Sequence, residues 1–479
     1  MPVAPENIHV MLITIALLGH LNPMLKFARR LTRKGVNVTL ATTEMDCRRM
    51  PRNKTLASDG SLSSTTAPIN VEFFSDGLSP EFERDKHGEV FFESLYNVGS
   101  KNLSDLLAEL HAKGMRFSCV VYNPFLPWVA EIASDHGIPC AVLWIQAWGV
   151  LSIYYHYCTN PHHFIDMEKD PNAIIRLPQM SPLAVKDLPS FILPSSPPFL
   201  KKLVLDFTRS LKKVKWVLGN SYDELEDKAQ LLPIDLRSSL RSVGPLVSPA
   251  MLGQEVEEAN NISGGLDTSN VESSCMKWLD QQTPNSVIYV SFGSMLILSQ
   301  SLVENIAMGL KNSNRPFLWV VPPPEMAFMK AAIEGEPLHK FMEETMGRGL
   351  VVMWSPQELV LTHPAIACFV THCGWNSAIE TVSGGVPVIA TPKWSDQPTN
   401  AKLLVDVHKI GVTLGNVLED AISARGVEDC IKEVMEGPRA LEMRKRAMQL
   451  REAARRALRD CGSSDKNIDD FINEITGKM

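Results

Sequence analysis

Short apolar runs rich in Val, Ile and Leu alternate with amphipathic stretches along the first half of the chain. The apolar runs lie at residues 8–15, 36–41, 70–74, 117–122 and 139–145. The segments between them have helical periodicity, and strand and helix in alternation predict a parallel sheet with helices on both faces. We therefore expect the first half to form an α/β domain.

The same alternation starts again in the second half of the chain. Apolar runs at 286–294, 316–321, 349–353, 366–371 and 386–390 each end at a turn, and a helical segment follows each of them. Two amphipathic helices close the chain, and a Gly-Ser-Ser-Asp break between them supplies the N-cap of the last one. This pattern predicts a second α/β domain.

The boundary between the halves is marked by a change in composition. Residues 246–274 lose apolar periodicity and gain Gly, Ser, Asn and acidic residues, which is typical of a linker. A chain of 479 residues is also too long for one core. We expect domains at 1–245 and 275–458 and a final helix at 459–479, with the ligand site between the domains at the C-terminal ends of the strands.

Composition narrows the class of protein. The net charge is −7 and no long basic run occurs, so nucleic-acid binding is not expected. Nine cysteines, an odd number without a CxxC pair, are typical of free thiols in a reducing compartment. No apolar stretch reaches the ~18 residues of a membrane span, and the first apolar run resembles a core strand more than a signal peptide. We expect a cytoplasmic protein.

Polar residues suited to phosphate binding gather after the apolar run 366–371. His372, Asn376 and Ser377 stand where a helix would begin, and a helix N-terminus offers free backbone N–H groups and the positive end of the dipole. Ser294 ends another strand-to-turn element that could reach the same phosphates. A diphosphate site is therefore expected here.

Two further residues fit nucleoside recognition. Glu380 lies one turn into the same helix, where it could accept hydrogen bonds from ribose hydroxyls. Trp354 follows a predicted strand, where its flat face could stack on a base. Each residue type is more often structural when it stands alone, but together they indicate a nucleotide site.

Residues 354–397 resemble the 44-residue signature of plant family-1 UDP-sugar glycosyltransferases. The matching residues are Trp354, Pro356, Gln357, His363, Phe369, His372, Gly374, Trp375, Asn376, Ser377, Glu380, Gly385, Val386, Pro387, Pro392 and Gln397, with Asn400 beyond. The similarity continues in GHLNP near the N-terminus, PFLPWVAEIA, NSYDELE and SVIYVSFGS. It implies the GT-B fold, with two Rossmann-like domains, a cleft between them, and a C-terminal helix that crosses back to the first domain.

The resemblance implies a role for each residue of the signature. Trp354 would stack on uracil beside Ser355 and Gln357, and Glu380 would hold the ribose. Ser294, His372, Asn376 and Ser377 would hold the diphosphate, and Asp396 and Gln397 would bind the sugar hydroxyls. Trp375 and Trp394 would wall the sugar pocket, although Trp375 could equally pack the turn. Gln397 indicates UDP-glucose as the donor, and neither a metal nor another cofactor is implied because the helix dipole and the donors stabilise the leaving UDP.

The resemblance also implies that His20, in GHLNP, deprotonates the acceptor for a direct, inverting attack on the anomeric carbon. The family usually places an Asp where this chain has Asn123, and it commonly has Gln where this chain has Leu18. In serine proteases the Asp-to-Asn change costs roughly 10⁴ in rate, because the tautomer is wrong and the cation is unsupported. This corresponds to about 5 kcal/mol if the acceptor must be deprotonated.

The acceptor decides whether that handicap applies. A phenol near pKa ~10 is uphill from a histidine near ~6.5 by roughly 4.8 kcal/mol, whereas a carboxylic acid is already ionised at neutral pH. The segments NPF and WIQAWGVLSIYYHY resemble the branch that forms glucose esters. We therefore favour a small carboxylic acid, with a phenolic hydroxyl as the alternative and nitrogen, sulfur or aromatic carbon as less favoured acceptors.

Other classes of protein lack their signatures. A non-catalytic nucleotide-sugar binding protein would keep 354–397 but lack the base, and His20 is present. A dinucleotide oxidoreductase would show GxGxxG after its first strand, and a hydrolase would show GxSxG, and neither motif occurs. No motif for the cofactor lysine of phosphorylase-like enzymes is present. We expect a monomer whose partners are small molecules.

Overall fold

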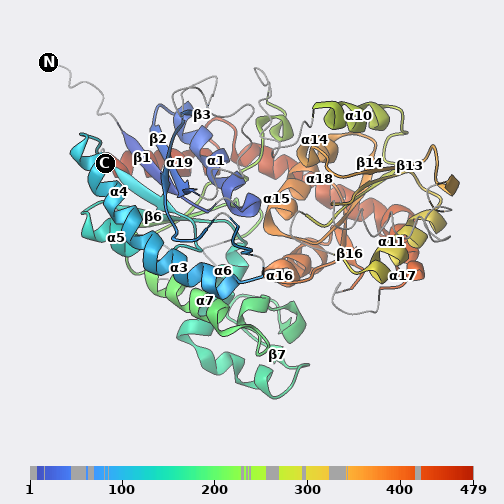
Figure 1. Ribbon diagram of the computed structural model, residues 1–479. Coiled ribbons are helices and arrows are strands. Elements are labelled where there is room, and N and C mark those ends of the chain that lie inside the picture. The colour runs from blue at the N-terminus through green and yellow to red at the C-terminus, as the bar shows by residue number, and fades with distance from the viewer. Residues whose placement is uncertain are drawn as a thin grey trace.

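The structure, a computed structural model, consists of two lobes side by side, each built on one sheet (Figure 1). It describes residues 8–15, 17–44, 61–62, 69–79, 81–84, 86–227, 231–232, 236, 239–254, 269–293, 298–322, 341, 343–415 and 422–477.

The first lobe contains an eight-stranded sheet in the order β10-β9-β6-β5-β1-β2-β4-β3, in which every neighbouring pair is parallel except β3 and β4. Its strands are β1 (His9–Ile13), β2 (Asn37–Thr43), β3 (Ser61–Leu62), β4 (Ile69–Phe74), β5 (Cys119–Tyr122), β6 (Cys140–Trp144), β9 (Trp216–Gly219) and β10 (Leu240–Ser242). Its helices are α1 (Leu18–Arg33), α3 (Gly88–Ser94), η1 (Leu95–Gly99), α4 (Ser100–Ala112), α5 (Val129–Asp135), α6 (Trp148–Thr159) and α7 (Pro198–Ser210).

A small substructure lies between α6 and α7, at the bottom of Figure 1. It contains the two-stranded antiparallel sheet β7 (Ile174–Ile175) and β8 (Leu183–Ala184) and the short helices η2 (Pro161–Glu168), η3 (Val185–Asp187) and η4 (Ser190–Ile192). Residues 176–200, which contain six prolines, form the part of this region from the end of β7 to the start of α7.

The second lobe contains a six-stranded, fully parallel sheet in the order β13-β12-β11-β14-β15-β16. Its strands are β11 (Val287–Ser291), β12 (Phe317–Val320), β13 (Gly349–Val352), β14 (Ile366–Thr371), β15 (Val388–Ala390) and β16 (Gly411–Thr413). The helices of this half of the chain are η5 (Pro249–Leu252), α10 (Ser269–Asp280), α11 (Gln300–Asn312), α14 (Gln357–Thr362), α15 (Trp375–Gly384), α16 (Gln397–Lys402), η6 (Leu403–Val407), α17 (Ala424–Glu436), α18 (Ala440–Ala457) and α19 (Ser463–Ile475).

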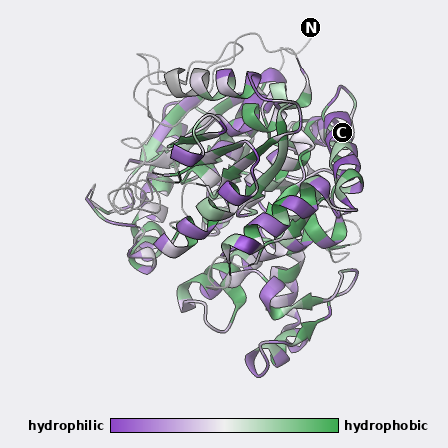
Figure 2. Cartoon of the chain, turned by 90° about the vertical axis from the view of Figure 1, so that its right-hand side faces the viewer, coloured by the Kyte–Doolittle hydropathy of each residue, from purple (hydrophilic) through white to green (hydrophobic). Residues whose placement is uncertain are grey.

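Both faces of the first sheet are buried, as a parallel sheet covered by helices requires. Along β1 the side chains alternate, so that Val10 and Leu12 join one core and Met11 and Ile13 join another on the opposite face. Figure 2 shows the same arrangement, with hydrophobic strands inside and hydrophilic positions on the outer faces of the helices. This explains why the strands have continuous apolar sequences.

The chain ends by returning to the first lobe. The Phe471 ring of α19 lies 6.4 Å from Phe27 of α1 and 5.3 Å from Trp216 of β9, measured between centroids. Arg241 of β10 forms an ion pair of 2.9 Å with Glu474. The predicted fold class, two parallel α/β domains with a final helix that crosses back to the first, is therefore confirmed.

The structure corrects several local expectations. Strands β9, β10 and β16 were not predicted, because three or four residues are too few for a clear apolar pattern. Residues 269–274, expected in the linker, lie in α10, and 255–268 lie outside the described residues. In the part of the chain that is described, no helix has both the length and the apolar character to cross a membrane.

Candidate active site

His20 lies in the first turn of α1, which begins at Leu18. Its Nδ1 is 2.9 Å from Oδ1 of Asn123, the residue that directly follows β5. The backbone N–H of Phe125 donates to the same Oδ1 at 3.1 Å. The ends of two neighbouring strands, β1 and β5, therefore bring together two residues that are 103 positions apart.

These contacts determine the tautomer of His20. Because the Phe125 N–H donates to Oδ1 of Asn123, that atom is an acceptor, and Nδ1 of His20 must carry the proton that it shares with Oδ1. The lone pair then remains on Nε2, as a base needs. The wrong tautomer expected from the protease comparison is not found, and what Asn123 lacks is a negative charge.

The surroundings of His20 keep it neutral. Burial lowers the pKa of His20 to about 4, and the hydrogen bond to Asn123 only partly opposes this effect. The Phe125 ring packs against the imidazole edge to face, with centroids 4.3 Å apart. Asn123 is fully buried, and its Nδ2 has no hydrogen-bond partner among the described residues.

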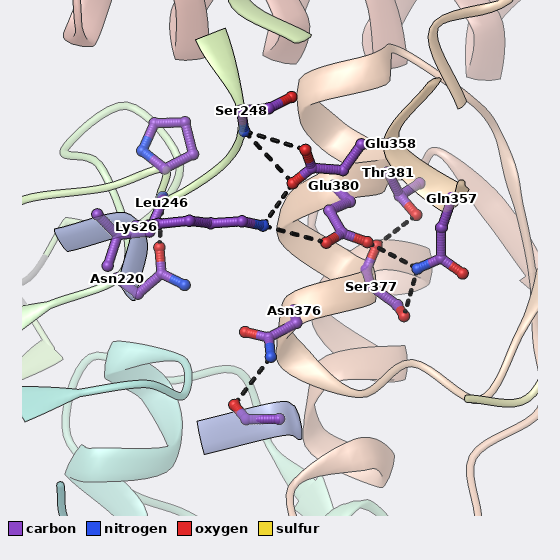
Figure 3. Close-up of polar contacts among 12 residues, drawn as sticks. Lys26, Asn220, Leu246, Ser248, Gln357, Glu358, Asn376, Ser377, Glu380 and Thr381 are labelled. Carbon is purple, nitrogen blue, oxygen red and sulfur yellow. Dashed lines mark hydrogen bonds and ion pairs between the residues drawn. The ribbon is translucent and has the colours of Figure 1, made fainter. Parts of the chain in front are cut away.

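Pro23 explains how α1 contacts the second domain. Proline has no N–H and cannot bond the carbonyl four residues earlier, which here is that of Gly19. That carbonyl instead accepts a hydrogen bond of 2.9 Å from Nδ2 of Asn376, at the start of α15 (Figure 3). The predicted phosphate residue Asn376 therefore lies beside the turn of helix that carries His20.

His372 is enclosed by two glycines. A Cβ atom on Gly293 would lie 2.9 Å from the imidazole, and one on Gly374 would lie 2.6 Å from it. Burial lowers the pKa of His372 to about 4, and its Nδ1 has no partner in the described part of the chain. The side chain thus stands neutral at the N-terminus of α15. Ser294, predicted to join it, lies outside the described residues.

The predicted nucleoside residues form one hydrogen-bonded network. Nε2 of Gln357 donates to Oγ of Ser377 at 3.0 Å and to Oε2 of Glu380 at 2.7 Å. The Tyr289 hydroxyl lies 2.9 Å from Oγ of Ser355 and donates to Oε1 of Gln357 at 3.1 Å. Gln357 is thereby held between β11 and α15.

Of the two aromatic residues at the nucleoside site, Trp354 was predicted from the sequence and Tyr289 was not. Trp354 follows β13 and is half-buried, as a base-stacking residue needs. Tyr289 was missed, since a single hydroxyl within an apolar strand resembles a core residue. Its ring is buried and stacks on Phe369 at 4.7 Å.

Lys26 and Glu358 were also missed by sequence reasoning. Lys26 extends from α1 to the second domain, where it forms ion pairs with Glu358 and, at 3.5 Å, with Glu380 (Figure 3). No local signal marks this contact, because a lysine on an amphipathic helix is usually a solvated residue.

The predicted sugar residues surround the loop before α16. Asp396 is buried and accepts a hydrogen bond of 2.8 Å from Asn400, and burial raises the pKa of Asp396 to about 6. Oε1 of Gln397 accepts from the backbone N–H groups of Lys393 and Trp394 at 2.9 and 3.2 Å. Nε2 of Gln397 is therefore the end that can donate to a sugar hydroxyl.

The two tryptophans of the signature differ in position. Trp394 is 36% exposed, as expected for the wall of an open pocket. Trp375 is buried, and its indole N–H donates to the backbone carbonyl of Asn220 in the first domain at 2.8 Å. This contact favours the packing alternative that the sequence left open for Trp375.

The loop of Trp394 is held by the first domain. The N–H of Ser190 donates to the carbonyl of Ser395 at 2.8 Å, and the N–H of Ser395 donates to Oγ of Ser190 at 2.7 Å. Lys402 forms an ion pair of 3.1 Å with Asp187. The short helices η3 and η4 therefore support the predicted sugar loop.

A small cavity of about 20 Å³ lies in the first domain, on the far side of Phe125 from His20. Aromatic residues dominate its lining, namely Phe125, Trp144, Tyr154, Phe191 and Phe207, and no lining residue carries a full charge. Phe125 separates the cavity from the imidazole of His20. These side chains therefore form an aromatic, uncharged surface close to His20.

Comparisons with known proteins agree with this geometry. The family model described as "UDP-glucoronosyl and UDP-glucosyl transferase" matches residues 259–453. The UDP-glycosyltransferase 84B1 of Arabidopsis thaliana is 44% identical over 98% of this chain and 98% of its own. The cinnamate beta-D-glucosyltransferase of Fragaria ananassa is 36% identical over 98% of this chain and 82% of its own. The crystal structure of Os79 from O. sativa in complex with UDP matches 97% of this chain and 100% of that one, with a TM-score of 0.80 and 29% identity.

Proposed function

The chain belongs to the UDP-glycosyltransferase family and is an enzyme of that kind with the GT-B fold, and from this premise we propose that it transfers glucose from UDP-glucose to the carboxylate of a small aromatic acid. The product is a glucose ester with an inverted anomeric configuration. The alternative, transfer to a phenolic hydroxyl, requires a stronger base than the site contains.

The observation that carries the proposal is the neutral Asn123 beside His20. With a His20 pKa of about 4, removing a proton from a phenol near pKa ~10 is uphill by ~6 units, or ~8 kcal/mol. A carboxylic acid near pKa ~4 is ionised at neutral pH and needs no base. Because His20 has no carboxylate partner to raise its pKa, the barrier to removing a proton from a phenol stays high.

The aromatic surface and a relative support the same acceptor class. Cinnamate has one carboxylate and no hydroxyl group, so the glucosyltransferase of Fragaria ananassa named for it must act on a carboxylate oxygen. The aromatic side chains near His20 offer a surface on which such a ring would pack by dispersion and edge contacts. The carboxylate would then point away from this surface toward the sugar.

We further propose the donor roles that the signature implies. Trp354, Ser355 and Gln357 bind the uracil, and Glu380 binds the ribose. His372, Asn376 and Ser377 at the start of α15, with Ser294, bind the diphosphate, where free N–H groups favour an anion. Asp396 and Gln397 bind the glucose hydroxyls, with Trp394 as the wall, while Trp375 holds the two domains together.

The reaction follows from these roles. A carboxylate oxygen attacks C1 of glucose from the face opposite UDP, the bond between C1 and the diphosphate oxygen breaks, and its electrons leave with UDP. The N-terminus of α15 and Asn376 stabilise the charge that develops on the diphosphate. We propose that these donors suffice without a metal ion, so that EDTA leaves the rate unchanged, and a rate restored by Mg²⁺ after EDTA would contradict this.

We also propose that the enzyme acts as a monomer in the cytoplasm. The eight cysteines that the structure describes carry free thiols, which supports a reducing compartment. Light scattering of the purified protein and fractionation of cells that express it would test the two statements separately.

The acceptor proposal is tested with 2-naphthoate and 2-naphthol, which have the same ring system. Each is incubated with UDP-glucose, and the products are identified by mass and by hydrolysis in mild base, which cleaves an ester but not an aryl glucoside. We expect kcat/KM for the acid to exceed that for the naphthol by at least about a hundredfold, since the proton-transfer gap corresponds to more than that. Equal or better use of 2-naphthol would refute the carboxylate proposal.

A further inference from the structure

Two members of the ion-pair cluster at the domain boundary, Lys26 and Glu358, have no part in the function described so far. The cluster consists of Lys26 from α1, Glu358 from α14 and Glu380 from α15 (Figure 3). All three side chains are at least three-quarters buried. The inference drawn from it rests on the proposed role of Glu380 in binding the ribose.

The two carboxylates are satisfied to different degrees. Glu358 bonds Lys26 and also accepts from the backbone N–H of Ser248 at 3.1 and 3.3 Å. Oε2 of Glu380 accepts from Gln357, but among the described residues the partner of its Oε1 is Lys26 at 3.5 Å, beyond normal hydrogen-bond length. Oε1 of Glu380 therefore keeps its capacity to accept from a hydroxyl group.

We propose that Lys26, although it belongs to the first domain, is a positioning residue for the UDP-sugar: it holds Glu380 as the charged acceptor for the ribose hydroxyls. The cluster has two acids and one base, so Lys26 is the group that allows both acids to stay ionised in a buried place. Burial raises the pKa of Glu380, and the charge of Lys26 acts in the opposite direction.

Other charged groups near the cluster do not replace Lys26. Arg29 and Arg30 of α1 act on Glu358, and Arg30 also donates to the carbonyl of Pro245 at 3.2 Å. Tyr289 of β11 faces Glu380, but burial raises its pKa and leaves it neutral. Among the described residues, Lys26 is the cation that pairs with Glu380.

The contact also connects the donor to the base. Asn376 and Glu380 lie one turn apart on α15, and they contact Gly19 and Lys26 of α1, respectively. His20 is adjacent to Gly19 on that helix. The two residues proposed to bind the UDP-sugar, Glu380 and Asn376, are thus the same two that contact the helix of His20. The position of His20 therefore depends on the UDP-sugar site.

The experiment measures binding of UDP and of 2′,3′-dideoxy-UDP by calorimetry between pH 5.5 and 8.5, and it needs no acceptor. In Lys26→Met we expect the Kd for UDP to rise by about tenfold at pH 7, while the Kd for the dideoxy compound changes less than twofold. The pH below which UDP binding weakens should move up by about 1–3 units, the usual effect of losing an opposite charge at this distance.

Three further variants make the result specific. Lys34→Met is the matched control, because Lys34 lies at the end of the same helix and pairs with Asp465 and Asp469 at 2.7 Å each. It should bind UDP as the wild type does. Lys26→Arg should retain most of the affinity, and Lys26→Met combined with Glu358→Gln should recover it, because one buried acid is removed.

Two outcomes overturn the inference, and they can be distinguished. If Glu380→Gln still prefers UDP to the dideoxy compound as the wild type does, the ribose role of Glu380 is wrong and the inference falls with it. If Glu380→Gln loses that preference but Lys26→Met weakens both ligands equally with no pH displacement, the ribose role stands and Lys26 only packs the domains together.

Discussion

Replacing Asn123 with Asp should change which acceptors the enzyme can use. The exchange is nearly isosteric, and Oδ1 can still accept from His20 Nδ1 and from the Phe125 N–H. Nδ2 of Asn123 has no partner in the described structure, so its replacement by oxygen breaks no hydrogen bond. The substitution therefore adds one buried negative charge 2.9 Å from the imidazole and alters little else.

The size of the effect follows from the pKa of His20. A carboxylate at this distance raises a histidine pKa by about 1–3 units. Starting from a pKa of about 4, the gap to a phenol near pKa ~10 falls from ~6 units to ~3–5 units, or by ~1.4–4 kcal/mol. We expect kcat/KM for 2-naphthol to rise by about 10- to 1000-fold.

The same change should not help an acid. 2-Naphthoate is already ionised, and the new charge would repel it by about 3 kcal/mol at roughly 6 Å with an effective dielectric constant near 20. We expect kcat/KM for the acid to fall by about tenfold or more after screening. The preference for the acid should therefore shrink by at least two orders of magnitude.

The assay is a pair of pH–rate profiles, one for each naphthyl acceptor, for the wild type, Asn123→Asp and Asn123→Ala. In Asn123→Ala both profiles should fall together, because the acceptor that orients His20 is lost and no charge is added. If the Asp variant changes the rates with both acceptors alike, or leaves the rate with 2-naphthol unaffected, the neutral charge of Asn123 does not set the acceptor preference.

Three other changes test the site at its sugar, loop and nucleoside ends. Because burial raises the pKa of Asp396 to about 6, the KM for UDP-glucose should rise as the pH falls below about 6. Asp396→Asn should abolish this pH dependence and raise the KM at pH 7. An unchanged pH profile in the Asn variant would count against the contact between Asp396 and the sugar. Ser190→Ala removes the acceptor for the N–H of Ser395 and should raise the KM for UDP-glucose by about fivefold, the equivalent of one hydrogen bond, whereas Ser196→Ala, whose hydroxyl has no partner in the described structure, should not. Tyr289→Phe should lower the free energy of unfolding by about 1–2 kcal/mol in urea titrations and weaken UDP binding, and an effect on stability alone would assign Tyr289 to the core.

The donor site was predicted from sequence because its residues lie close together in the chain. Trp354 through Gln397 form one segment of alternating strands and helices, so their spacing alone places them along one edge of the sheet. Glu380 was identified from its position in the predicted helix and Gln397 from the resemblance to the glycosyltransferase signature, but neither shows which side-chain atoms are free. Hydrogen bonds to neighbours, such as those of Lys393 and Trp394 to Gln397, decide that.

Contacts between the domains could not be predicted in the same way. Lys26 and Glu358 are 332 positions apart, and each looks like an ordinary surface residue of an amphipathic helix. The effect of Asn123 was predicted only in part: the missing charge follows from the residue type, but the tautomer depends on the backbone N–H of Phe125. Sequence reveals which groups are present, and packing decides which of their hydrogen bonds are already made.

Pro23 shows how one residue can serve both the helix and the domain contact. Inside a helix, proline costs about 3 kcal/mol relative to alanine and leaves one carbonyl without its partner. Here that carbonyl belongs to Gly19, and Asn376 of the other domain supplies the missing donor at 2.9 Å. Most carbonyl groups of α1 accept hydrogen bonds from within the helix. A carbonyl of α1 can therefore bond the other domain only where a hydrogen bond of the helix is missing. The proline after GHLN creates that gap one residue before His20, and this explains why the histidine, the free carbonyl and the proline occur together in so short a segment.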